Sequence, residues 1–198
     1  MKRDLLKMLQ SLLRGELSRT RRRRGNRSPW AIGGLVIAIA AISYFLHEPK
    51  APPSTLPKGA ELSCTVKSVY DGDTLTARCP AGEVKVRVFG IDAPEMGQKP
   101  WGTGSRDVLR GLLPDRDNIT LRVRDQDRYG RTVAQVFAGE RDAGLEMVRQ
   151  GRATVYEQYN DSAAYRQAQA EAKRDRRGIW EKSGSQQNPA AWRRLNPR

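Results

Sequence analysis

Short runs of β-branched and aliphatic residues, separated by turn-forming residues, occupy the middle of the chain. In Val84–Phe89 the valines at 84, 86 and 88 alternate with Lys85 and Arg87. Because successive side chains of a strand point to opposite faces, the valines share one face and Arg87 leaves the sheet on the other. Five such runs predict β-strands over residues 61–70, 74–79, 84–91, 119–123 and 132–137.

Three further segments have the composition or the apolar spacing of α-helices. They cover residues 105–113, which end at Pro114, residues 142–150, and a segment from about residue 161 to Gly178 that carries a stripe of alanines. The combination predicts an α+β fold, a small five-stranded β-barrel with about three packed α-helices, over residues 60–181. The tail over residues 182–198 is expected to be irregular.

The pattern of the first 60 residues is different. Residues 30–46 carry no charge, and 17 residues at about 1.5 Å each approach the lower limit for crossing a bilayer. We expect a single transmembrane helix there, followed by a proline-rich tether over residues 47–59. A cleaved signal peptide and a buried core helix are the alternatives, but the long charged leader and the absence of a small-x-small site disfavour cleavage.

Charge is distributed unevenly along the chain, whose net charge is +14. The leader over residues 1–29 holds ten Lys or Arg against two acidic residues, so the positive-inside rule places it in the cytoplasm. The 60–181 domain would then lie on the other side of the inner or plasma membrane, in the periplasm or outside the cell. A basic chain favours polyanions, either lipid headgroups or nucleic acid, and nothing in the sequence indicates a protein partner.

Two acidic clusters stand out against this basic background. Asp71 and Asp73 flank a glycine at an expected turn, and Asp92 and Glu95 follow a predicted strand. An isolated Asp-Gly-Asp is usually only a turn. A barrel can bring both strand ends together, however, and opposed carboxylates then need a cation. Oxygen ligands select Ca²⁺ or Mg²⁺, while one histidine and two cysteines provide no zinc set.

Two arginines frame these acids, Arg87 before Asp92 and Arg131 within Tyr129-Gly-Arg131. Either one alone could be a solvated cation at a strand end. Together with a metal ion, two guanidinium groups are suited to a phosphodiester, whose negative charge grows on its equatorial oxygens during cleavage. Glu95 would then be free to activate water.

At this level of detail the chain resembles the thermonuclease, or staphylococcal-nuclease-like, family. Five pieces match in order and spacing between about residues 61 and 180: VYDGDT (69–74), VRVFGIDAPE (86–95), DRYGRTVAQVF (127–137), LEMVRQGRA (145–153) and AEAKRDRRGIW (170–180). The resemblance implies an OB-fold barrel and Ca²⁺-dependent cleavage of DNA and RNA that leaves 3′-phosphates.

The resemblance also implies roles for individual residues. Asp73 and Asp92 would be the calcium carboxylates, with Ala93 contributing its backbone carbonyl. Glu95 would act as general base or orient water, Arg87 and Arg131 would clamp the phosphate, and Tyr129 would line a nucleotide pocket. Ala93 replaces the family's usual threonine, and the tyrosines within residues 155–159 differ from the family pattern.

The two cysteines are expected to form a disulfide. If Asp71-Gly72 is the turn of a hairpin, the numbers of paired residues add up to 143, which places Cys64 opposite Cys79. An extracytoplasmic compartment would be oxidising enough to keep the bond. Two buried thiols are the alternative, and a bulge near Asp73 could shift the register.

A function of a different class is also open. Nuclease-like barrels can lose catalysis and remain nucleic-acid-binding modules. Such a module is expected to lack one or more of the acids and arginines to which the resemblance gives a role. This chain keeps all five of them: Asp73, Asp92, Glu95, Arg87 and Arg131. In a third interpretation, the arginine-rich leader is the part that binds nucleic acid or lipid.

Overall fold

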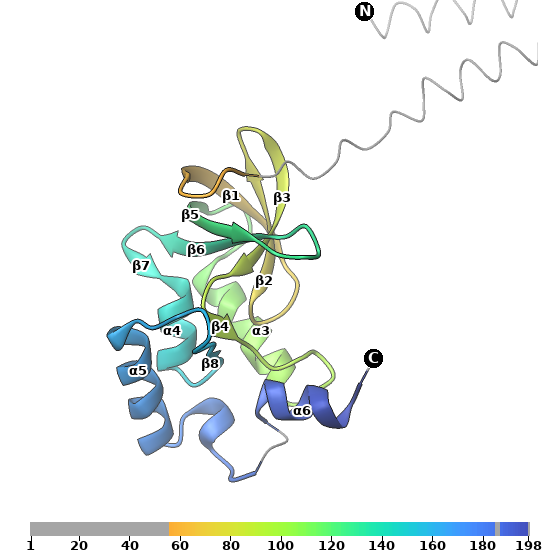
Figure 1. Cartoon of the computed structure of the whole chain (residues 1–198), viewed down its shortest axis with the longest axis vertical. Helices are drawn as coiled ribbons and strands as arrows, with labels where there is room; N and C mark the ends of the chain where they lie inside the picture. The colour runs from red at the N-terminus through yellow and green to blue at the C-terminus, as the bar shows by residue number, and fades with distance from the viewer. Residues whose placement is uncertain (1–55, 185–186, 198) are drawn as a thin grey trace, which may run out of the picture. The chain divides into compact units, whose positions relative to one another are not determined.

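Five strands close into a barrel, as the sequence predicts (Figure 1). They are β1 (Glu61–Val69), β2 (Thr74–Cys79), β3 (Gly82–Val88), β5 (Asn118–Gln126) and β6 (Thr132–Ala138). The strand order is β3-β2-β1-β5-β6, and a parallel pairing between β3 and β6 joins the two ends. This arrangement is consistent with the OB-fold.

The computed structural model describes residues 56–184 and 187–197. The leader, the candidate membrane helix over residues 30–46 and most of the tether lie outside these ranges. Within the described residues, no helix is both long enough and apolar enough to span a bilayer.

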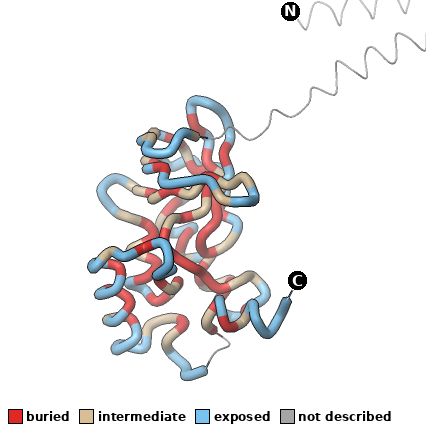
Figure 2. The backbone as a smooth tube through the Cα atoms, in the orientation of Figure 1, coloured by how far each residue is buried: buried red, intermediate tan, exposed pale blue. Residues whose placement is uncertain are grey.

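The barrel core is made from the strand faces that the alternation predicts. Val84, Val86 and Val88 are at most 1% exposed, whereas Arg87 lies on the opposite face of β3 and keeps 15% of its side chain exposed. Figure 2 shows buried residues following the strands, with exposed residues at the turns and along the outer faces of the helices. The apolar interior therefore leaves Arg87 available to a site outside the core.

Four α-helices occur among the described residues, against the three predicted. They are α3 (Trp101–Leu112), α4 (Ala143–Arg149), α5 (Ala163–Arg174) and α6 (Pro189–Leu195), and a 3₁₀ turn spans Gly178–Trp180. The prediction of an irregular tail is wrong because α6 lies within it. Its start signals are Asn188, whose side chain accepts a hydrogen bond from the Ala191 N–H at 2.9 Å, and Pro189 in the first turn.

Helix α3 begins four residues earlier than predicted, at Trp101 instead of Ser105. Gly102 and Gly104 have low helix propensity, which hides this first turn in the sequence. Gly102 is needed for packing, because a Cβ atom there would lie 2.0 Å from the Glu95 carbonyl oxygen. The glycine therefore lets the start of α3 approach the backbone of the segment that carries Glu95.

Two short strands, β7 (Arg141–Asp142) and β8 (Thr154–Val155), were not predicted. The predicted strand over residues 84–91 is interrupted by a turn at residues 89–90, which separates β3 from the short strand β4 (Ile91–Asp92). Antiparallel pairing of β4 with β8 places Asp92 opposite Thr154. The Thr154 hydroxyl donates to the Asp92 carbonyl at 3.2 Å. This two-residue sheet fixes the backbone of Asp92 beside the open end of the barrel.

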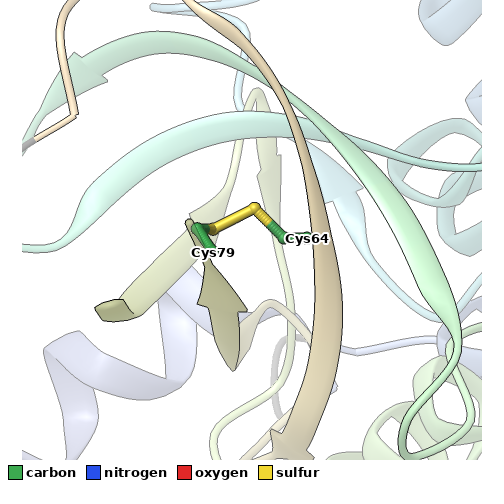
Figure 3. The surroundings of a disulfide bond; sticks show 2 residues. All are labelled: Cys64 and Cys79. Atoms are coloured by element: carbon green, nitrogen blue, oxygen red, sulfur yellow. A yellow bond between two sulfur atoms is a disulfide. The ribbon is translucent and has the colours of Figure 1, made fainter. Parts of the chain in front are cut away.

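Cys64 and Cys79 form a disulfide between β1 and β2, which is the pair that the hairpin register predicts (Figure 3). The turn is wider than the predicted two residues, since Val69 pairs with Leu75. A bulge between Val66 and Ser68 shifts the register back, so that Thr65 pairs with Arg78. The wider turn and the bulge compensate for each other at the position of the cysteines.

We expect the reduced protein to lose about 3 kcal/mol of unfolding free energy, because the bond closes a loop with a sequence separation of 15 residues. Urea unfolding with and without a reductant measures this difference. The Cys64→Ala, Cys79→Ala double variant is the control, since it should be unaffected by the reductant. Equal stability of oxidised and reduced wild-type protein would contradict the expectation.

Candidate active site

The turn between β1 and β2 is organised by its own acidic residues. The Asp71 carboxylate accepts a hydrogen bond from the Asp73 N–H at 3.0 Å, which shapes the turn. Burial, with the neighbouring Asp73 charge, raises the pKa of Asp71 to about 6. A Cβ atom on Gly72 would lie 2.7 Å from the Cβ atoms of both Ala93 and Ser105. Glycine thus allows this turn to contact the second acidic segment.

Asp73 is 7% exposed and is held by three partners. Its Oδ1 accepts from the Thr74 hydroxyl at 3.0 Å, its Oδ2 accepts from the Ala93 N–H at 2.9 Å, and Arg87 forms an ion pair with it. Residues from β2, β3 and the segment after β4 therefore meet at one carboxylate.

Arg87 connects the two acidic clusters. Its Nη1 pairs with Asp73, its Nη2 lies 3.6 Å from Asp92 Oδ1, and the same Nη2 donates to the Ile91 carbonyl at 3.1 Å. Asp92 is 5% exposed, and this burial raises the pKa of its carboxyl although hydrogen bonds and nearby arginine charges oppose the shift. One guanidinium thus bridges two buried carboxylates.

Glu95 lies in the connection between β4 and α3. Its N–H donates to the Gln98 side-chain oxygen at 2.9 Å, and its carbonyl accepts from the Gln98 N–H at 2.8 Å. Gln98 is 2% exposed, whereas the Glu95 side chain keeps 22% of its surface exposed. The loop therefore has a fixed backbone and presents a carboxylate that solvent reaches.

Arg131 approaches the same end of the barrel from the loop between β5 and β6. Asp127 accepts from its Nε at 2.6 Å and from its N–H at 2.9 Å, while Nη1 lies 3.4 Å from the Thr74 hydroxyl. Since Thr74 also donates to Asp73, Arg131 is linked to the acidic site through one side chain. The parallel pairing of Val86 with Thr132 sets this proximity.

The tyrosines Tyr129, Tyr156 and Tyr159 are exposed. Tyr129 is 69% exposed, and its ring contacts the guanidinium groups of Arg128 and Arg131. Tyr156 and Tyr159, in the segment where the tyrosine pattern departs from the family, form an edge-to-face pair with ring centres 4.9 Å apart. Exposed aromatic rings beside arginines are typical of surfaces that bind nucleotides.

Sequence reasoning missed one member of the site, Arg193 of α6. Its Nη1 lies 3.1 Å from Asp92 Oδ1 and 3.1 Å from Glu95 Oε1, and its Nη2 lies 2.5 Å from Asp92 Oδ2. Partial burial works against its charge, but the hydrogen bonds that it donates to both acids, with their negative charges, outweigh burial and raise the pKa of Arg193. No local pattern predicts a contact between residues 101 positions apart.

The donor set fits a hard cation better than a soft one. Asp73 and Asp92 supply carboxylate oxygens on either side of Arg87, and no third His, Cys, Asp or Glu joins them in a metal-binding arrangement within residues 56–184 and 187–197. Two carboxylates leave the remaining positions to carbonyl oxygens and water, which Ca²⁺ accepts. Ala93 contacts Asp73 through its N–H, so the role of its carbonyl stays a prediction.

Comparisons with known protein sequences indicate the family of this chain. The sequence model of a family described as "Staphylococcal nuclease homologue" matches residues 85–182. An "Uncharacterized endonuclease" of Haemophilus influenzae is 38% identical over 133 residues, which cover 67% of this chain and 73% of its own. A "Micrococcal nuclease" of Shigella flexneri is 32% identical over 154 residues, which cover 72% of this chain and 86% of its own.

Proposed function

Because this chain belongs to the staphylococcal nuclease family and is a phosphodiester hydrolase, we propose that it is a Ca²⁺-dependent nuclease acting on DNA and RNA. The observation that carries this proposal is the contact of Arg87 with both Asp73 and Asp92 at the open end of the barrel. Three predicted site residues from separate segments are thereby brought together. The family resemblance further suggests 3′-phosphate products.

Asp73, Asp92 and the Ala93 carbonyl are the groups proposed to hold the cation. When bound, Ca²⁺ would neutralise phosphate charge and polarise the phosphodiester towards attack. The bond from the Ala93 N–H to Asp73 keeps the two acidic segments together.

Arg87 and Arg131 are proposed to contact the phosphate oxygens, where charge grows in the transition state. Asp127 binds Arg131 through Nε and thereby orients its guanidinium, while Nη1 is directed at Thr74 beside Asp73. Glu95 would take a proton from the attacking water, for which its partly exposed carboxylate is suited. Tyr129 would stack against a nucleotide.

Digestion of plasmid DNA and of RNA by the purified full-length protein tests the proposed function. We expect cleavage with Ca²⁺, none with a chelator, and strongly reduced cleavage by Asp73→Asn and Asp92→Asn, because an amide oxygen is a poorer ligand for a hard cation. Binding of DNA without cleavage under any metal condition would instead favour the nucleic-acid-binding module.

We further propose that residues 30–46 tether the nuclease to the inner or plasma membrane with residues 1–29 in the cytoplasm. The support is the uncharged segment and the ten basic residues before it. Protease added to intact spheroplasts should release a soluble fragment containing the barrel. Protection of the full chain until the spheroplasts are lysed would refute this topology.

A further inference from the structure

Helix α6 lies beside the connection between β4 and α3 and carries Arg193 into the acidic site (Figure 1). The Arg193 guanidinium engages both oxygens of Asp92 and one oxygen of Glu95. Planar guanidinium groups that face a carboxylate with two nitrogens make strong and directional contacts. The helix lies beyond residues 85–182, the segment that matches the family, so this contact is not part of the matched region.

Packing also holds α6 in this place. Asn188 caps the helix, Pro189 and Ala191 are buried, and the Trp192 ring lies against Gly97, where an added Cβ atom would come within 3.2 Å of it. Gly97 lies two residues after Glu95. The contact of Trp192 with Gly97 and the ion pairs of Arg193 therefore fasten α6 to the loop that carries the proposed general base.

Arg193 occupies the groups that the proposed reaction needs. A cation shared by Asp73 and Asp92 requires an Asp92 oxygen, yet both Asp92 oxygens face Arg193 nitrogens. Glu95 Oε1 faces the same guanidinium at 3.1 Å, so a water molecule has to compete with Arg193 for that oxygen. Docked α6 and a loaded cation site therefore compete for the same carboxylate.

We infer that α6 is an inhibitory latch, whose Arg193 takes the place of the cation at Asp92 and blocks Glu95 until Ca²⁺ displaces it. This inference rests on the proposed function, since it assigns a regulation to the same site. The side chain of Arg193 is 42% exposed, and α6 is a helix of seven residues that is not part of the sheet. Release of α6 from the site is therefore expected to leave the strand pairing of the barrel intact.

Removal of the latch should tighten Ca²⁺ binding. Ca²⁺ binds only the molecules whose site is not blocked, so blocking lowers the apparent affinity for Ca²⁺. Loss of a hydrogen bond between charged groups changes such an equilibrium constant by about 10-fold. We therefore expect Arg193→Ala to bind Ca²⁺ about 10-fold more tightly than the wild type, with Arg193→Lys in between.

The matched control is Arg194→Ala, which removes the same charge from the next residue of the same exposed helix end. Its Ca²⁺ affinity should stay within about 2-fold of the wild type, because screened surface charges act weakly at a distance. Titration calorimetry on the full-length proteins in detergent measures all four affinities, and plasmid cleavage at limiting Ca²⁺ should rise for Arg193→Ala.

A second measurement reports on α6 directly. Ca²⁺ should accelerate hydrogen exchange of the amides of residues 190–195 in the wild type, whereas in Arg193→Ala these amides should exchange fast with or without Ca²⁺. Unchanged exchange in the wild type at saturating Ca²⁺ would overturn the latch, even if Arg193→Ala binds the ion more tightly.

The outcomes separate the two proposals. Equal Ca²⁺ affinity of wild type, Arg193→Ala and Arg194→Ala in a protein that cleaves DNA would overturn the latch and leave the proposed function intact. Absence of Ca²⁺ binding and of cleavage in every variant would overturn both.

Discussion

Glu95→Gln is expected to lower the rate of DNA cleavage at saturating Ca²⁺ by roughly 10²- to 10⁴-fold, which is the range that general base catalysis contributes. The amide has nearly the same shape as the carboxylate but cannot accept a proton from water. The backbone contacts of this residue with Gln98 do not involve the carboxylate, and the amide oxygen of glutamine can still accept from Arg193, so the loop should keep its conformation.

Initial cleavage rate, DNA affinity and melting temperature should be measured together for this variant. We expect the loss to appear in the rate, with DNA affinity and melting temperature close to those of the wild type. Glu83→Gln is a suitable control, because Glu83 pairs with Lys67 and Arg78 on the surface. Normal cleavage by a folded Glu95→Gln protein would show that Glu95 is not the general base.

Arg87→Lys and Arg131→Lys should each lower turnover by on the order of 10²-fold or more with Ca²⁺ still bound, since lysine keeps the charge but cannot make bidentate contacts. The two variants should differ in stability. Arg87 bridges two buried acids, so its loss should also lower the melting temperature. Arg131 contacts Asp127 and Thr74 near the surface, so its replacement should affect mainly turnover.

Arg122→Lys serves as the control for these substitutions, because Arg122 pairs with Glu61 at the start of β1, the end opposite the acidic turn. Its turnover should equal that of the wild type. If activity and melting temperature fell in parallel for both Arg87→Lys and Arg131→Lys, the arginines would have a structural role and the proposed phosphate contacts would be wrong.

Much of this site follows from the sequence because its members lie at strand ends. Alternating valines in β3 locate Arg87 on the outer face, and barrel closure then brings Arg87, Asp73 and Asp92 to one end. The early start of α3 could not be predicted, since Gly102 is favoured there by the close approach of another segment and disfavoured by helix propensity.

The position of Arg193 is a different kind of omission. Helix α6 has cap signals, but a short helix without a broad apolar stripe does not indicate which surface it will contact. The disulfide is a third case, because the pairing of Cys64 with Cys79 was predicted from a two-residue turn. The observed turn is wider, and a bulge that was not predicted between Val66 and Ser68 restores the register. Local spacing predicts elements better than it predicts tertiary contacts.

The parallel pairing of β3 with β6 has a consequence for how the protein is made. This pairing sets Arg87 opposite Val133, two residues after Arg131, and it joins parts of the chain that are far apart in the sequence. A nascent or unfolded chain that lacks this pairing is therefore expected to lack the proposed phosphate contacts. We expect cleavage of nucleic acid to begin only after the barrel has closed.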